Sequence, residues 1–196
     1  MKNIILTPGQ KAISINLDSS IYGSLVEIGA GQEVARQLFR VGSASGTIAK
    51  TMSAYDRDFS DAIYGKEKNG RYVCKSRLVK MLDKEYDLLE ERLDRNNFKQ
   101  TRYFTFADTV TTINYDKTKQ GHGWIGLRFQ LTPNGPANDF LIHVRLKDQE
   151  AKIQQETIGI IGINLLHACF NETNPKVILN HLYDNFIHPI KNYICS

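Results

Sequence analysis

The sequence has few of the residues that mark secreted, fibrous or membrane-embedded proteins. Its three cysteines among 196 residues are widely spaced, without a C-x-x-C pair, so they signal neither a disulfide framework nor a zinc site. No stretch rich in proline, glycine and serine is long enough to separate two domains. The N-terminal segment lacks the apolar run of a signal peptide, and the longest apolar stretch, 158–170, is shorter than the roughly 20 residues that cross a bilayer. We therefore expect a cytoplasmic protein with no membrane segment.

The composition is that of a globular protein with a small positive charge. Hydrophobic residues make up 41% and charged residues 23%, and 25 Lys or Arg against 21 Asp or Glu give a net charge of +4. We expect one domain over residues 1–196. Basic and acidic side chains alternate over 66–102, which is typical of a solvated helix face and disfavours nucleic-acid binding. The surplus still permits an anionic partner.

Hydrophobic spacing divides the N-terminal half into short elements. Alternation predicts a strand over 11–17, and 22–28 is expected to be another short extended segment. Helical spacing predicts helices over 32–39, 47–55, 60–64 and 76–96. The last of these has the most regular apolar side, and Ser76 suits its N-cap.

The C-terminal half predicts a sheet followed by helices. Strands are predicted over 103–113, 124–131 and 140–146, and the short loops between them favour an antiparallel meander. A long apolar helix over 149–170 and a last helix from Lys176 to about His188 follow. The fold class is therefore α+β, with a meander of three or more strands packed against helices, a helical N-terminal half and two C-terminal helices.

One face of the predicted meander is polar. Alternation places Trp124, Arg128 and Gln130 of the second strand on the same face as His143 and Arg145 of the third. The opposite face carries the apolar residues of both strands. His122 would lie at one end of the polar face. On the first strand, Asp108 shares the phase of two phenylalanines, so we expect it to be buried, or shifted by a bulge, and paired with Arg128 or Arg145.

These residue types suit a small anionic ligand. The guanidinium groups of Arg128 and Arg145 match phosphate or carboxylate, the indole of Trp124 offers a stacking plane, and Gln130 adds hydrogen bonds. His143 or His122 could transfer a proton, with Asp108 orienting it. The polar face therefore predicts a nucleotide-like or phosphorylated ligand, in a domain that could belong to an enzyme. The plain alternative is a polar sheet face turned to water.

The turn Gly29-Ala30-Gly31 stands before a predicted helix, as in phosphate-binding turns. Gly29, Gly31 and Arg36 are therefore candidate ligand-binding residues. The third glycine of G-x-G-x-x-G is replaced by Val34, and no β-α-β unit is predicted, so a structural turn is the favoured alternative.

No metal site is predicted and no cofactor is identified. The acidic residues Asp56, Asp58 and Asp61 lack the other ligands of a calcium loop. His181, Asp184 and His188 have chelating spacing, but a surface helix near a chain end favours a structural explanation.

A non-catalytic assembly module is the alternative to ligand binding. Gly159 and Gly162 would let another backbone approach the long apolar helix, and an exposed sheet edge could pair with a protein partner or a second copy. An RNA-binding surface built from Arg128, Arg145 and Trp124 is a weaker alternative.

Segments spread over most of the chain, among them EIGAGQEVAR, GTIAKTMSAYD, FADTV, GHGW and HVR, resemble a bacterial protein family of unestablished function. Members of that family are longer, so the resemblance implies that residues 1–196 form the N-terminal part of a longer protein or a reduced relative. Members often carry the labels TonB-dependent receptor or nicotinate-nucleotide adenylyltransferase. The first requires a large membrane barrel and the second an HxGH motif, where this sequence has Gly121-His122-Gly123-Trp124. The resemblance assigns no reaction.

Overall fold

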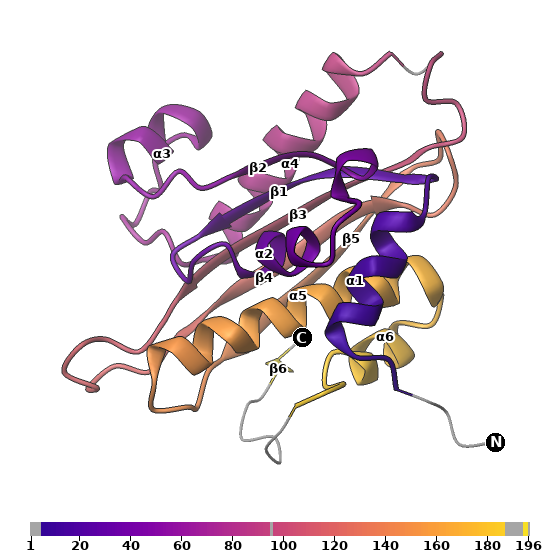
Figure 1. The fold of residues 1–196 in the computed structure, drawn as a ribbon. Helices are drawn as coiled ribbons and strands as arrows, with labels where there is room; N and C mark the ends of the chain where they lie inside the picture. Colours follow the sequence, from indigo (N-terminus) through magenta and orange to yellow (C-terminus); the bar gives the residue numbers. More distant parts are fainter. Residues whose placement is uncertain (1–4, 95, 187–193, 196) are drawn as a thin grey trace.

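A mixed β-sheet lies between two layers of helices in the computed structural model, which describes residues 5–94, 96–186 and 194–195 (Figure 1). The helices are α1 (Pro8–Leu17), α2 (Glu33–Arg40), α3 (Arg57–Tyr64), α4 (Lys75–Arg92), α5 (Ala151–Asn171) and α6 (Pro175–His181), with a short 3₁₀ turn at Ala44–Gly46. The strands are β1 (Ile21–Ile28), β2 (Ile48–Met52), β3 (Arg102–Thr111), β4 (His122–Gln130), β5 (Ala137–Arg145) and β6 (Ile194–Cys195). The predicted α+β class and the two C-terminal helices are confirmed.

The sheet is parallel at one side and antiparallel at the other. Its strand order is β2-β1-β3-β4-β5-β6, with β1 parallel to both β2 and β3. From β3 onward each neighbour is antiparallel, so β3, β4 and β5 form the predicted meander. Its boundaries differ from the prediction by only a few residues.

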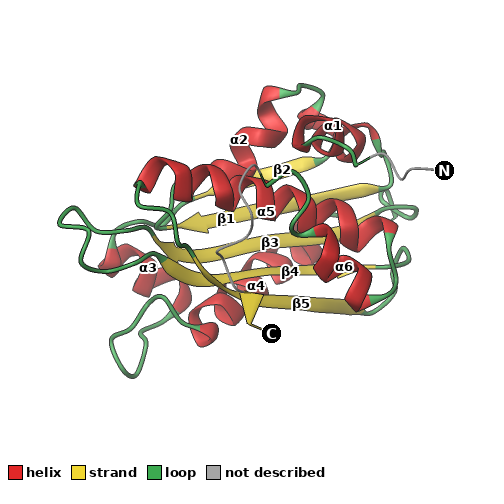
Figure 2. Cartoon of the chain, turned by 90° about the horizontal axis from the view of Figure 1, so that it is seen from below, coloured by secondary structure: helices red, strands yellow, loops and turns green. Residues whose placement is uncertain are grey.

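The two faces of the sheet are covered unequally. Helices α1, α2, α5 and α6 share one face, where they enclose the larger apolar core around Phe104, Phe106 and Ile125 (Figure 2). On the other face α4 packs on β1, β3 and β4, with Leu78 and Leu82 in a smaller core. Because α4 covers only part of that face, side chains near the ends of β4 and β5 are open to solvent.

The predicted strand over 11–17 is wrong, because this segment is the helix α1. Thr7 caps the helix by accepting a hydrogen bond from the backbone N–H of Gln10, whose side chain bonds back to Thr7, and Pro8 stands in the first turn. Residues 11, 12, 15 and 16 are buried, which is a helical repeat. The alternating isoleucines imitate a strand, whereas the capping residues that precede them specify a helix.

The predicted helix over 47–55 is also wrong, because Ile48–Met52 forms strand β2. The chain leaves β1, passes through α2 and returns parallel to β1, so β1, α2 and β2 make the β-α-β unit that the sequence was expected to lack. Ile48 and Thr51 are β-branched and favour an extended backbone.

Helix α5 crosses the large core, as its apolar sequence predicts. A Cβ on Gly159 would lie 3.2 Å from the backbone oxygen of Glu33, and one on Gly162 would lie 2.2 Å from a methyl of Val34. The expected close backbone approach therefore exists, but its partner is α2 of the same chain. None of the helices in the described ranges has both the length and the apolarity to span a membrane.

A buried polar cluster attaches the C-terminal helix α6 to α1 and α5. The Lys11 ammonium lies 2.6 Å from Asp184 Oδ2 and donates to Asn164 Oδ1 at 2.8 Å, and His181 Nδ1 lies 2.9 Å from the same Asp184 oxygen. Two of the three residues with chelating spacing therefore contact Lys11 or one another, and the third, His188, lies outside the described residues. The described residues contain no metal-binding group of three or more such ligands.

Replacing Gly162 by Val should destabilise the fold, because the added side chain would displace Val34 and separate α2 from α5. We expect the free energy of unfolding in urea to fall by about 1–3 kcal/mol. Gly46 is the control, since nothing lies within 4 Å of a Cβ there, and Gly46→Val should have a much smaller effect. Equal losses at both positions would contradict this description of the α2–α5 contact.

Candidate functional site

Cross-strand rows organise the α4 side of the sheet. The register of β3, β4 and β5 places three residues side by side in each row. From one end of the strands, the rows are Thr111–His122–Arg145, Thr109–Trp124–His143, Ala107–Gly126–Leu141 and Thr105–Arg128–Asp139. The predicted common face of β4 and β5 is therefore present, and its polar residues belong to different rows.

The two rows that contain Gly126 and Arg128 are closed by α4. A Cβ on Gly126 would lie 3.0 Å from Leu78 and from Leu82. Arg128 donates through Nε and Nη2 to Asp139 at 2.7 and 2.8 Å and through Nη1 to Asp83 of α4 at 2.6 Å. The Asp139 carboxylate, and to a smaller extent Asp83, raise the pKa of this guanidinium. Arg128 thus joins α4 to the sheet, with its donors turned to protein carboxylates.

Gln130 is buried and connects backbone segments. Its side chain accepts a hydrogen bond from the Tyr103 N–H at 3.0 Å and donates to the Gly135 carbonyl at 2.8 Å. The structure therefore places this predicted ligand-binding residue in the framework between β3 and the β4–β5 turn.

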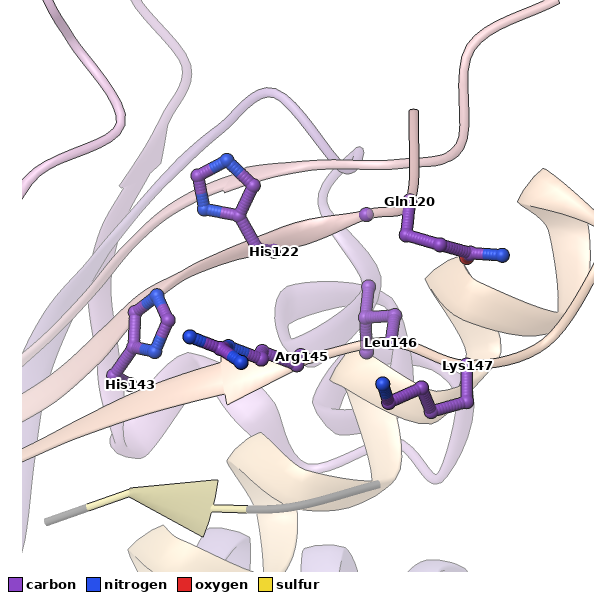
Figure 3. Close-up of a pocket in the computed structure, with 7 residues that line it drawn as sticks. Gln120, His122, His143, Arg145, Leu146 and Lys147 are labelled. Carbon is purple, nitrogen blue, oxygen red and sulfur yellow. The ribbon is translucent and has the colours of Figure 1, made fainter. Parts of the chain in front are cut away.

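The two outer rows border an open hollow of about 460 Å³ (Figure 3). Its walls come from the start of β4 and the end of β5, with lining residues Gln120, Gly121, His122, His143, Arg145, Leu146 and Lys147. The rings of His122 and His143 are 5.9 Å apart between centroids, and the indole of Trp124 is 5.0 Å from His143. Three of the predicted site residues, His122, His143 and Arg145, thus line the hollow, and Trp124 lies beside His143, packed against the smaller core.

The lining of this hollow is basic. Among the described residues, its lining contains no acidic side chain and Arg145 has no ion-pair partner, in contrast to Arg128. Partial burial, followed by the nearby His122 and Arg145, lowers the pKa of His143. A neutral imidazole is a proton acceptor at pH 7, so the hollow combines positive charge with a group that can accept a proton.

Helix α5 fixes the rim of the hollow through Gln154, a fully buried residue. Gln154 accepts a hydrogen bond from the Ile113 N–H at 2.6 Å and donates to the Asp148 carbonyl at 2.7 Å and to Gln120 at 3.3 Å. Gly121 must lack a side chain here, because a Cβ would lie 2.3 Å from the Gln154 amide oxygen. Gln120 and Gln154 are not among the predicted site residues, whereas Lys147 continues the phase of Arg145 along the sequence.

Asp108 lies on the opposite face, which corrects its expected pairing with an arginine. It is fully buried on the α5 side, paired in register with Glu27 of β1, so it cannot orient His143. One carboxylate oxygen accepts from the Ile28 N–H at 3.2 Å, and the other has no hydrogen-bond partner. Burial, and then the nearby Glu27, raise the pKa of Asp108 well above its ordinary value. The prediction of burial is confirmed.

Glu27 occupies the N-terminus of α2. Its carboxylate accepts hydrogen bonds from the N–H groups of Val34 at 3.0 Å and Ala35 at 2.9 Å. Burial raises its pKa to about 7, against the lowering effect of these bonds. The backbone donors that could have received a phosphate are therefore bonded to a side chain of the same protein.

The glycine turn packs against β3. Gly29 has a φ of 105°, and a Cβ there would lie 2.1 Å from the Val110 carbonyl oxygen; Gly31 has a φ of 90°. The positive φ angles and the close approach to Val110 explain why glycine stands at these positions without any bound ligand. Arg36, the third candidate of this group, lies on α2 beside a different hollow, with Phe39 and Arg40. The structure does not bring these three residues to the basic hollow.

Solved structures with a similar fold include competence/damage-inducible proteins. CihA from Agrobacterium tumefaciens is 17% identical, with a TM-score of 0.57 over 87% of this chain and 99% of that one. A CinA superfamily protein from Enterobacter cloacae is 12% identical, with a TM-score of 0.58 over 87% and 96% of the two chains. No family model and no curated protein matches the sequence. At these identities the likeness shows the fold alone.

Asp108→Asn should change how stability depends on pH. A raised carboxyl pKa stabilises the folded state below the ordinary value of 3.8, and this contribution is lost as the pH rises through the folded value. We expect the melting temperature of the variant, relative to the natural chain, to be higher at pH 8 than at pH 5.5. Asp116→Asn, at an exposed loop position, should give a difference that does not vary with pH. A pH-independent difference for Asp108→Asn would contradict the raised pKa.

Arg128→Ala should weaken the fold without removing the basic hollow. The change leaves Asp83 and Asp139 without their shared cation and removes the ion-paired link between α4 and β4, while the packing of Leu78 and Leu82 remains. Because these carboxylates are partly exposed, we expect a loss of about 1–2 kcal/mol in the free energy of unfolding by urea. An unchanged stability would show that the ion pairs contribute nothing to the attachment of α4.

Proposed function

We propose that this chain is a cytoplasmic domain that binds a small anionic ligand of the nucleotide or sugar-phosphate class in the hollow at the β4–β5 end. Arg145 would bind the phosphate or carboxylate of the ligand, Lys147 would add positive charge at the rim, and Trp124 would offer a flat face to a heterocycle. The observation that carries the proposal is the contrast between the two arginines. Arg128 is bonded to two carboxylates, whereas Arg145 has no ion-pair partner among the described residues and lines an open space.

The charge of the hollow supports an anion over a cation or a neutral ligand. Among the described residues, its lining offers guanidinium, imidazole and amide groups and no carboxylate. A guanidinium donates parallel hydrogen bonds that match phosphate or carboxylate oxygens, so binding there would be directional as well as electrostatic. The volume of about 460 Å³ is in the range of small-molecule sites.

His143 is the residue best placed for chemistry on such a ligand. Its imidazole lies next to both Trp124 and His122, and its lowered pKa leaves the ring neutral at physiological pH. In this state His143 could accept a proton from the ligand or from water. Bound anionic charge would raise the pKa of His143 again, so ligand binding and protonation of this ring would be linked.

Thermal denaturation tests the proposal. We expect nucleoside monophosphates or sugar phosphates at about 1 mM to raise the melting temperature by roughly 2–4 °C, because a ligand that binds only the folded state stabilises it. Inorganic phosphate should give a smaller rise, since it makes no contact with Trp124. Absence of a shift with every member of this set would overturn the proposed ligand class.

Variants of Arg145 test whether the ligand binds in this hollow. Arg145→Ala should weaken ligand affinity at least about tenfold, measured by calorimetry, because the charged donor is lost. Arg145→Lys should keep the charge and restore part of the affinity. Arg92→Ala is the matched control, since Arg92 is an exposed arginine at the far end of α4, and it should bind as the natural chain does. Equal affinity in Arg145→Ala and the natural chain would place the ligand elsewhere.

A further inference from the structure

The β2 edge of the sheet is open. Strand β2 pairs with β1 on one side, and within the described residues no strand pairs with it on the other (Figures 1 and 2). At the opposite edge, β6 pairs with β5 at His143 and Val144. An unpaired edge presents backbone N–H and C=O groups that can receive another extended segment.

The usual protection of such an edge is weak in β2. Lysine side chains often guard edge strands, but the ammonium of Lys50 is bonded to the buried carboxylate of Glu85 on the α4 side. The strand has no proline. The backbone edge over Ile48–Met52 is therefore accessible to a partner strand.

A second hollow of about 400 Å³ lies beside this edge, between α2 and β2. It is lined by Gln32, Ala35, Arg36, Phe39, Arg40 and Thr51. The Phe39 side chain is 49% exposed although it is large and apolar, and the hydroxyl oxygen of Thr51 is buried without a hydrogen-bond partner. The hollow thus offers an apolar contact next to open backbone groups.

The charge of this hollow is positive. Arg40 has no ion-pair partner within the described residues, and Arg36 has only an exposed contact of 3.4 Å with Glu33 one helical turn away. Exposed contacts of this kind contribute little, so both guanidinium groups can bind carboxylates of a partner. The rim therefore suits an acidic occupant.

We propose that the β2 edge and the adjoining hollow bind an extended acidic peptide segment of a protein partner. The segment would add as a strand to Ile48–Met52, set one apolar side chain against Phe39 and direct carboxylates toward Arg36 and Arg40. Backbone pairing would supply affinity, and the hollow and its charge would supply specificity. A second copy of this chain fits less well, because twofold pairing of β2 with β2 would bring both copies of α2, with their arginines, to the same side of the joined sheet.

Hydrogen exchange with peptide pools tests this inference. The probe is a pool of capped peptides of about eight residues that alternate Glu with Val, Ile or Tyr, and the control pool has Gln in place of Glu. We expect the acidic pool to protect the amides of Ile48–Met52 from exchange and to bind at least about tenfold more tightly than the control pool. Raising the salt from about 0.05 to 0.5 M should reduce the difference.

Variants separate this surface from the basic hollow at the other end of the sheet. Arg36→Ala with Arg40→Ala should weaken binding of the acidic pool at least about tenfold and leave the response to nucleotides unchanged. Arg145→Ala should weaken the response to nucleotides and leave binding of the acidic pool unchanged. Arg92→Ala should leave both unchanged. Because all of these arginines are exposed, circular dichroism should show unaltered folding.

Three results would overturn the inference. They are equal binding of the Glu and Gln pools, protection at β5 instead of β2, and no protection by either pool. If light scattering shows a stable dimer, and hydrogen exchange shows that its β2 amides are protected without peptide, the edge belongs to a second copy of the chain.

Discussion

The alternation of side chains along β4 and β5 has to serve two helical layers at once. Each strand sends every second residue into the large core beneath α5, so the intervening residues face α4 whether or not that helix reaches them. Helix α4 covers the rows of Gly126 and Arg128, and Trp124 of the next row packs against the same small core, whereas His122 and Arg145 of the outermost row are exposed. The same strand phase therefore produces an ion-paired attachment at one end and an open basic hollow at the other.

Buried carboxyl groups organise the region beneath α2. Glu27 accepts the first N–H groups of that helix, and Asp108 lies next to it on β3 with one oxygen unbonded. Two neighbouring acids in a dry environment cannot both be ionised without a large cost in free energy. The capping role of Glu27 favours its charge, whereas Asp108 has less hydrogen bonding to compensate for burial.

The sequence predicted those parts of the fold in which local pattern and burial agree. The meander and α5 have long periodic segments, and their phase placed His122, Trp124, His143 and Arg145 on one face. The predictions for 11–17 and 47–55 are wrong because short apolar repeats fit the period of a helix as well as that of a strand. Helix capping at Thr7 makes the first segment a helix, and pairing with β1 makes the second a strand. The Asp83–Arg128 contact joins elements 45 residues apart, so no local pattern could reveal that Arg128 is occupied.

Helix α5 touches the supports of both hollows. Near its start, Gln154 holds the loop at Gln120 and Gly121; one and two turns later, Gly159 and Gly162 press against α2, which carries Arg36 and Arg40. One helix thus contacts the supports of both surfaces. A substitution that displaces α5 from the sheet would therefore disturb both hollows, although neither is lined by an α5 residue.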